Sequence, residues 1–198
     1  ILLFRVGDFY ETFGQDAIIA SQVLGITLTK RNNGAASSSE LAGFPHHALD
    51  TYLHKLVKAG HRVAICDQLE DPKLAKGIVK RGVTEMVTPG VATNEKLLEH
   101  NTNNFLAGIQ VTDEKFGLAL LDISTGEFFI AEGNQEYIDK LLQTLKPSEV
   151  IFQRSFHKFF KESFGDKFYT YHLESWIFEE GYATEILLKH FQTHSLKG

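Results

Sequence analysis

The order of the apolar segments changes near residue 100, and this change limits the possible folds more than any other feature of the sequence. In the first half, strand-like runs are separated by stretches with helical spacing. In the second half, three strand-like runs follow one another with only short turns between them. Strands that alternate with helices indicate an α/β domain, whereas consecutive strands joined by turns indicate an antiparallel meander. We therefore predict two α/β domains, and the 198 residues are enough for each to bury a core.

The first half is predicted to form a mixed α/β domain. Gly25 and Gly60 mark the ends of two helices, because glycine often follows the last helical residue. Pro45 begins the second helix as a first-position proline. Segment 31–40 has no apolar side chains to bury and is predicted to be a mobile loop. The predicted strands are 1–6, 26–30, 62–66 and 83–87, and the predicted helices are 15–24 and 45–60.

The second half is predicted to begin with the meander and to continue with helices and one more strand. Residues 113–115 (DEK) and 124–126 (STG) separate the first three strands as turns. A helix with one apolar side precedes Pro147, and the last part of the chain is mainly helical. The predicted strands are 105–112, 116–123, 127–131 and 149–152, and the predicted helices are 137–145, 155–163 and 181–193.

A polar, Asn-rich stretch lies between the two halves, so the predicted domains are 1–95 and 105–198, with a linker at 96–104.

The two halves also differ in charge. The first hundred residues contain 11 Lys and Arg and 11 Asp and Glu, which gives a net charge of zero. The remaining residues contain 9 and 14, which accounts for the net charge of −5. This balance argues against a strongly basic protein that coats DNA, and any nucleic-acid contact is expected in the first half.

The sequence predicts no targeting signal. No signal peptide is expected, and no apolar run approaches the roughly 18 residues of a membrane span. The single cysteine, Cys66, lies in the apolar stretch RVAICD and is expected to be a buried hydrophobe. One cysteine suits a reducing, cytoplasmic setting. The chain starts at Ile1 inside a strand-like run, without a start Met, so we expect it to be a fragment of a longer protein.

Motifs for common chemistries are also missing. The sequence contains no G-x-x-x-x-G-K-[ST], G-x-G-x-x-G, G-x-S-x-G or C-x-x-C. His46, Asp50 and His54 are spaced by four residues, so one helix would bring these metal-ligand types to one side. The same spacing is common on the solvated side of a helix, and no metal site is predicted from it.

The meander leaves an RNase H-like nuclease open as an alternative. Such an enzyme needs clustered carboxylates that hold Mg²⁺, one of them within the first strand. The first strand, FLAGIQV, carries no carboxylate until Asp113 at its end. Asp122 and Glu127 lie on either side of the next turn and are expected to be surface residues at a hairpin end. Cleavage of nucleic acid that depends on Mg²⁺ would support this alternative.

The stretch GDFYETF allows two arrangements. If the chain is extended after Gly7-Asp8, Phe9 and Glu11 project from the same side and Tyr10 points into the core. If the chain turns helical instead, Phe9 and Phe13 lie one turn apart and pack inward together. Residue types and spacing alone do not decide between the two.

Several separated motifs then add a family resemblance that covers nearly the whole chain. GDFYETF, LTKR, LAGFPHHALDTYLHKLV, VAICDQLEDP and KRGVTEMVTPG occur in this order in the first half, which resembles the mismatch-recognition domain of the MutS family of DNA mismatch-repair proteins. FLAGIQV, DISTGEF and LKPSEVIF in the second half resemble the family's connector domain. The resemblance implies an RNase H-like α/β fold without nuclease activity for that connector domain.

The resemblance also implies roles for two residues. In the family, the aromatic residue of an F-x-E motif wedges into the duplex from the minor groove and stacks on the mispaired base, and the glutamate hydrogen-bonds that base. These positions are Phe9 and Glu11 here, and neither is catalytic. A wedge costs a few kcal/mol of unstacking, whereas an aromatic stacked on a base returns about 1–3 kcal/mol. The balance favours sites where pairing is already weakened, so local deformability rather than base sequence would be recognised.

Glu11 requires an explanation, because phosphates repel a carboxylate. We expect the glutamate to be protonated in many complexes, so that it donates to a base nitrogen. When ionised, it would accept from a base N–H instead.

Contacts to the DNA backbone are expected from local cations and from one turn. Lys30, Arg31, Lys80 and Arg81 are the candidate cations, or else they are solvated surface residues. The turn AGFPH resembles a family segment that lies near the DNA, which adds Gly43, Pro45 and His46. The sequence departs from the family pattern with Leu41 for a frequent methionine, Asp67 for a frequent glutamate and Gly82 for a larger residue.

The resemblance implies partners and cofactors beyond this chain. Mismatched double-stranded DNA and, through the connector domain, the protein MutL are the implied partners. A module that only binds proteins, with the second half as its surface, is a second alternative. Unchanged mismatch affinity after Phe9→Ala in the full-length protein would support it. The full-length protein would be a homodimeric, DNA-dependent ATPase that uses ATP and Mg²⁺ in a domain absent here, so this chain is predicted to be neither an enzyme nor a cofactor-binding protein by itself. A bacterial, nucleoid-associated location is implied as well. Because its first domain carries no net charge, the isolated chain is expected to bind DNA weakly.

Overall fold

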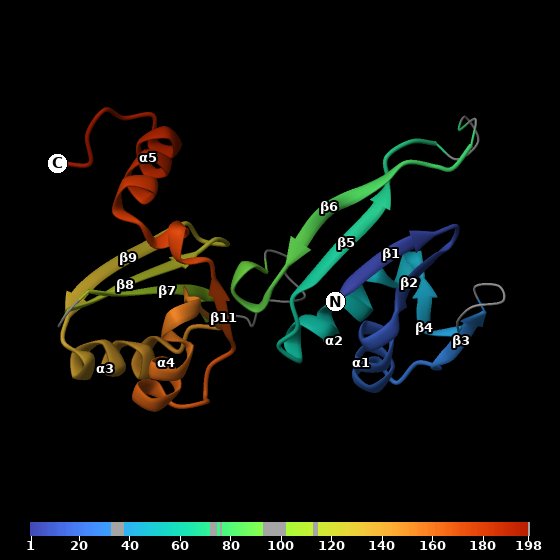
Figure 1. Cartoon of the computed structure of the whole chain (residues 1–198), viewed down its shortest axis with the longest axis horizontal. Coiled ribbons are helices and arrows are strands. Elements are labelled where there is room, and N and C mark those ends of the chain that lie inside the picture. Colours follow the sequence, from blue (N-terminus) through green and yellow to red (C-terminus); the bar gives the residue numbers. More distant parts are fainter. Residues whose placement is uncertain (33–37, 72–74, 76, 93–101, 113–114, 198) are drawn as a thin grey trace. The chain divides into compact units, whose positions relative to one another are not determined.

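The structure of the chain, a computed structural model, forms two compact units (Figure 1). Residues 1–32, 38–71, 75, 77–92, 102–112 and 115–197 are described. Unit 1 is Ile1–Thr102 and unit 2 is Asn103–Gly198, and each is considered by itself below. Most of the predicted linker at 96–104 lies outside the described residues. Within the described ranges, no helix is both long and apolar enough to cross a membrane.

The described residues of unit 1 form a six-stranded sheet and two α-helices. The strand order is β3-β4-β2-β1-β5-β6, and the described pairs are antiparallel except for β1 with β5. Consecutive strands β1 and β2 form a hairpin, whereas α2 connects β4 to β5. The elements are β1 Leu2–Val6, β2 Phe9–Phe13, α1 Gly14–Leu24, β3 Thr29–Asn32, β4 Ser38–Pro45, a 3₁₀ turn His46–Ala48, α2 Leu49–Lys58, β5 Val63–Gln68, β6 Arg81–Val87 and a 3₁₀ turn Pro89–Val91.

The prediction around residues 26–45 was partly wrong. The predicted strand at 26–30 is β3 at Thr29–Asn32, and part of the predicted loop at 31–40 belongs to strands. Main-chain hydrogen bonds join β3 to β4, so this edge hairpin forms without an apolar pattern in its side chains. Pro45 ends β4 instead of beginning a helix. Residues 33–37 of the predicted loop lie outside the described residues.

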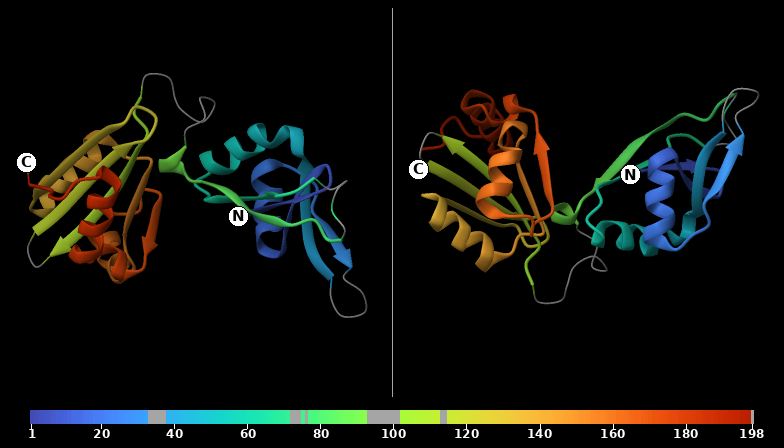
Figure 2. Two further views of the ribbon diagram at one scale, coloured as in Figure 1. Left: turned by 90° about the horizontal axis from the view of Figure 1, so that it is seen from above. Right: turned by 60° about the horizontal axis from the view of Figure 1, so that its bottom comes forward.

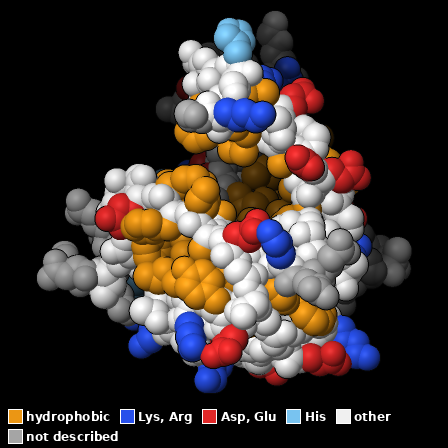
Figure 3. All heavy atoms as spheres, turned by 90° about the vertical axis from the view of Figure 1, so that its left-hand side faces the viewer, with side chains coloured by type: hydrophobic (Ala, Val, Ile, Leu, Met, Phe, Trp, Pro, Cys, Tyr) orange, Lys and Arg blue, Asp and Glu red, His pale blue; other side chains and the backbone are white. Residues whose placement is uncertain are grey.

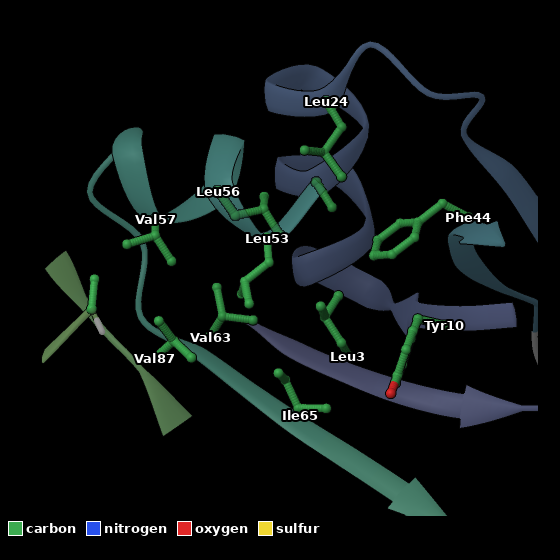
Figure 4. Packing of buried hydrophobic residues seen from close by; sticks show 12 residues of the cluster. Leu3, Tyr10, Leu24, Phe44, Leu53, Leu56, Val57, Val63, Ile65 and Val87 are labelled. Atoms are coloured by element: carbon green, nitrogen blue, oxygen red, sulfur yellow. The ribbon is translucent and has the colours of Figure 1, made fainter. Parts of the chain in front are cut away.

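Both helices of unit 1 cover the same face of the sheet (Figures 1 and 2). Side chains from β1, β2, β4 and β5 alternate inward and meet the apolar sides of the helices (Figure 4). Ala17, Ala20 and Leu24 of α1 are buried, whereas Phe13, which directly precedes the helix, is exposed. The cluster comprises Leu3, Tyr10, Ala20, Leu24, Phe44, Leu53, Leu56, Val57, Val63, Ile65, Val87 and Ala92.

Unit 2 is a five-stranded sheet in the order β11-β10-β7-β8-β9. The first three strands form the predicted antiparallel meander, and β10 and β11 then add in parallel beside β7. This arrangement agrees with the predicted RNase H-like α/β fold. The elements are β7 Phe105–Thr112, β8 Lys115–Asp122, β9 Glu127–Gly133, α3 Gln135–Leu145, β10 Glu149–Gln153, a 3₁₀ turn Arg154–Phe156, α4 His157–Phe164, β11 Thr170–Leu173, a 3₁₀ turn Ser175–Phe178 and α5 Glu180–Phe191.

The core of unit 2 lies between α3, α4 and one face of the sheet, and α5 lies on the other side (Figure 1). None of the residues of α5 is buried. Strand β11 was not predicted, because its four residues pair only with β10 and show no apolar alternation. Hydrophobic side chains also gather on the surface of this unit (Figure 3). Those exposed on β9 and α5 are Phe128, Phe129, Ile130, Tyr182, Ile186, Leu187 and Phe191.

Candidate nucleic-acid interface

The hairpin β1–β2 presents Phe9 at the surface of unit 1. Gly7 has a φ of 57°, a conformation that favours glycine, and Val6 pairs with Phe9 on the two sides of the turn. Residues 9–13 are extended, so the inward-packed helical arrangement was wrong. Phe9 is 48% exposed, whereas the neighbouring Tyr10 is only 3% exposed. Phe9 and Glu11 therefore project from the same face of the sheet.

Tyr10 anchors β2 on the core face of the sheet. Its hydroxyl donates to Oδ2 of Asp67 at 2.7 Å, which joins β2 to β5 across β1. Burial, and next the hydrogen bond to Asp67, raise the pKa of Tyr10 to about 12. Burial also acts to raise the pKa of Asp67, but hydrogen bonds from Tyr10 and from the Gln68 backbone N–H outweigh it, so that this pKa is lowered. At neutral pH the phenol is the donor and the carboxylate is the acceptor. This hydrogen bond helps to fix β2, the strand that carries Phe9.

Glu11 lies where the backbone of β4 comes close to β2, at Gly43. It pairs with Gly43 on β4, where an added Cβ would lie 3.0 Å from the Tyr10 backbone oxygen and 3.4 Å from Cγ of Glu11. A larger residue at Gly43 would therefore crowd the side chain of Glu11 and the backbone of β2. Oε2 of Glu11 lies 3.2 Å from a guanidinium nitrogen of Arg31, which comes from the edge strand β3. The side chain of Glu11 is 19% exposed and that of Arg31 is 50% exposed.

Pro45 and His46 support the turn of the hairpin. Pro45 pairs with Phe9, and the backbone N–H of His46 donates to the Asp8 oxygen at 2.9 Å. Nδ1 of His46 also lies 3.1 Å from that oxygen. The predicted DNA-backbone candidates Gly43, Pro45 and His46 thus lie next to the hairpin that carries Phe9.

The remaining candidate cations occupy different places. Lys30 is exposed on β3, on the opposite face from its neighbour Arg31. Lys80 is exposed just before β6, and its backbone N–H donates to Glu70. The guanidinium of Arg81 donates to the backbone oxygens of Arg5 and Val79, both at 2.8 Å.

Arg81 also lies against a ring. Its guanidinium carbon is 5.6 Å from the centre of the Phe4 ring. With two hydrogen bonds to backbone oxygens and this ring contact, Arg81 holds β1 to β6.

The residues considered for metal binding are separated. His46 lies in the 3₁₀ turn, whereas Asp50 and His54 lie in α2, so the predicted single helix was wrong. In the part of the chain that the structure describes, no group of three His, Cys, Asp or Glu side chains could hold a metal ion.

Asp122 is not the surface residue that was expected. It is 1% exposed, and its carboxylate accepts from the Ser124 hydroxyl and from three backbone N–H groups, those of Asn104, Ser124 and Thr125. Burial acts to raise the pKa of Asp122, but these hydrogen bonds outweigh it and lower the pKa below its usual range. Glu127 is exposed and hydrogen-bonded to Asn103, and Asp113 lies outside the described residues. The Asp122 carboxylate therefore closes the turn between β8 and β9.

The open face of the unit 1 sheet was missed in the sequence. Neither α1 nor α2 covers it, and it carries apolar side chains around Phe9 and Glu11. Alternation along β1 could have indicated it, since the residues of β1 that share the face of Phe9 are all apolar: Leu2, Phe4 and Val6. Exposed members are Leu2, Phe9, Phe13, Val83 and Met86.

Fold and site together define a two-domain α/β protein that presents an aromatic ring and a carboxylate side by side on an open sheet face. Comparison with known families agrees with this class. The family model for MutS domain I matches residues 1–96, and the model for MutS domain II matches residues 104–198. The chain belongs to the MutS family of DNA mismatch repair proteins.

Individual relatives share this sequence along its whole length. The chain is 62% identical over 197 residues to the DNA mismatch repair protein MutS of Flavobacterium johnsoniae, and 62% identical over 198 residues to that of Cytophaga hutchinsonii. It is 59% identical over 198 residues to that of Bacteroides thetaiotaomicron. Each comparison covers 100% of this chain but only 23% of the relative, so the chain spans about a quarter of the length of the proteins that it matches.

Proposed function

We propose that this chain recognises mismatched DNA by inserting Phe9 into the duplex, as part of a longer MutS protein. The observation that carries the proposal is the extended strand β2, which presents Phe9 and Glu11 on one exposed face while Tyr10 anchors the strand. A rigid support is needed because a wedge must resist the force that restacks the bases. Residues 1–95 would form the recognition domain and 105–198 the connector domain.

Glu11 would test the base that Phe9 has opened. Glu11 follows Phe9 by two residues on the same face of β2. Its carboxylate would hydrogen-bond a base in the groove, either as a protonated donor or as an ionised acceptor. Paired bases already use these atoms with each other, whereas a mispaired base leaves some of them free. Discrimination therefore comes from the difference between the two kinds of site.

Replacement of Glu11 by Gln tests the role of the carboxylate. The amide is neutral and still donates, so Glu11→Gln is expected to keep or raise affinity for DNA, because the repulsion from phosphates is removed. Affinity for the fully paired duplex should rise more than affinity for the mismatched one, so that the ratio of the two falls several-fold. Fluorescence anisotropy with matched 30-base-pair duplexes, using the full-length protein that carries this chain, measures both affinities. Loss of binding to both duplexes would contradict the assigned role of Glu11.

The full-length protein would act as a homodimer that hydrolyses ATP with Mg²⁺ in its remaining domains. These activities are inferred for the longer protein, and its place of action would be chromosomal DNA at the nucleoid in the cytoplasm. The connector domain would bind MutL. Biolayer interferometry is expected to show MutL binding to the 198-residue chain but not to a chain of residues 1–96. A chain that fails to bind MutL would remove the connector domain from this role.

A further inference from the structure

We propose that Arg31 is a positioning residue that exchanges partners when a mismatch is found. With no mismatch engaged, it pairs with Glu11, and when Glu11 turns to a mispaired base, Arg31 transfers to a backbone phosphate. This inference rests on the proposed function of Phe9 and Glu11. It explains how a protein can carry a carboxylate into the field of the DNA phosphates.

The sheet order brings the pair together. Strand β4 separates β3 from β2, so the contact between Arg31 and Glu11 crosses β4. Arg31 pairs with Ser39 and Glu11 with Gly43, so the arginine side chain extends along β4 as well as across it. The N···O distance of 3.2 Å allows a charge-assisted hydrogen bond. Period-two alternation places Arg31 and Glu11 on the same open face as Phe9.

The two members of the pair differ in exposure, and this difference gives the exchange its direction. Glu11 is mostly covered, whereas half of the Arg31 side chain is exposed. An ion pair with an exposed arginine contributes little to stability, because water and salt screen it, so breaking it is easy. A guanidinium also matches the geometry of a phosphate, which offers it a stronger partner. Arg31 can therefore leave Glu11 as soon as the glutamate gains a base.

The exchange predicts a difference in salt dependence. Each phosphate that a cation neutralises adds about 0.9 to the slope of log affinity against log salt concentration. In the wild type, Arg31 would contact phosphate only in the mismatch complex, so this complex should show a slope about one unit steeper than the complex with paired DNA.

Two variants and a control test the exchange in the full-length protein. Arg31→Gln removes the cation, so both duplexes are expected to give the shallow slope. Glu11→Gln removes the partner and frees Arg31 for any duplex, so both are expected to give the steep slope. Lys30→Gln changes an exposed cation on the opposite face of the same strand and should leave the difference of about one unit in place.

The outcomes separate this proposal from the one on which it rests. Equal slopes for both duplexes in the wild type, or unchanged slopes in Glu11→Gln, would overturn the exchange. Phe9→Ala in the same assay reports on the proposed function itself. If that variant loses mismatch affinity while the slopes do not differ, the wedge stands and the role of Arg31 fails.

Discussion

Phe9→Ala is expected to reduce affinity for a mismatched duplex about 10- to 100-fold and to leave affinity for the paired duplex nearly unchanged. A stacked aromatic ring contributes about 1–3 kcal/mol per base, and about 1.4 kcal/mol corresponds to a factor of ten. On paired DNA the ring must first unstack a base step, so little affinity depends on it there. Anisotropy titrations of the full-length protein with the two duplexes at one fixed salt concentration measure both effects.

Phe13→Ala is the matched control for this prediction. Phe13 lies on the same strand and the same open face as Phe9, and it is 37% exposed. Removal of either ring exposes little of the core, so both variants should fold. Phe13 lies away from the hairpin turn and is expected to change mismatch affinity less than threefold, a fraction of the roughly 1–3 kcal/mol of a stacking contact. Unchanged mismatch affinity in Phe9→Ala, or an equal loss in the two variants, would contradict the wedge.

The part of the site that depends on one strand could be predicted from the sequence. Alternation along an extended chain places Phe9 and Glu11 together, and Gly7-Asp8 indicates where the strand turns. Whether the chain is extended there depends on Tyr10, whose hydroxyl needs a partner 57 residues away. That partner, Asp67, lies on β5, and no local pattern indicates that its carboxylate serves this contact.

The pair of Arg31 and Glu11 could not be predicted, because it depends on the order of strands in space. Residues 31–40 look like a loop, since their side chains form no apolar pattern. The strand pairing of β3 with β4 comes from main-chain hydrogen bonds instead. Arg31 reaches Glu11 only because β4 lies between β3 and β2. Pro45 misled for a local reason, because a proline suits the end of a strand as well as the first turn of a helix.

Asp122→Asn is expected to destabilise unit 2 by about 2–4 kcal/mol at pH 7, the largest effect on stability among the changes considered. The carboxylate is 1% exposed and accepts from three backbone N–H groups and a hydroxyl. An amide of the same size turns one acceptor into a donor, so at least one buried N–H loses its partner. Urea unfolding followed by Trp176, the only tryptophan of the chain and a residue of unit 2, measures the loss.

The pH dependence of this loss separates a structural carboxylate from a catalytic one. Because hydrogen bonds lower the folded-state pKa of Asp122 below its ordinary value of 3.8, the charge stabilises the fold above pH 3.8. That contribution disappears as the pH falls through the lowered pKa, so the gap between wild type and Asp122→Asn should be constant from pH 5 to 7 and shrink below about pH 4. Glu132→Gln, on an exposed ion pair of the same sheet, should leave the unfolding free energy almost unchanged at every pH. A nuclease would require the opposite result: a stable Asp122→Asn variant that has lost Mg²⁺-dependent cleavage.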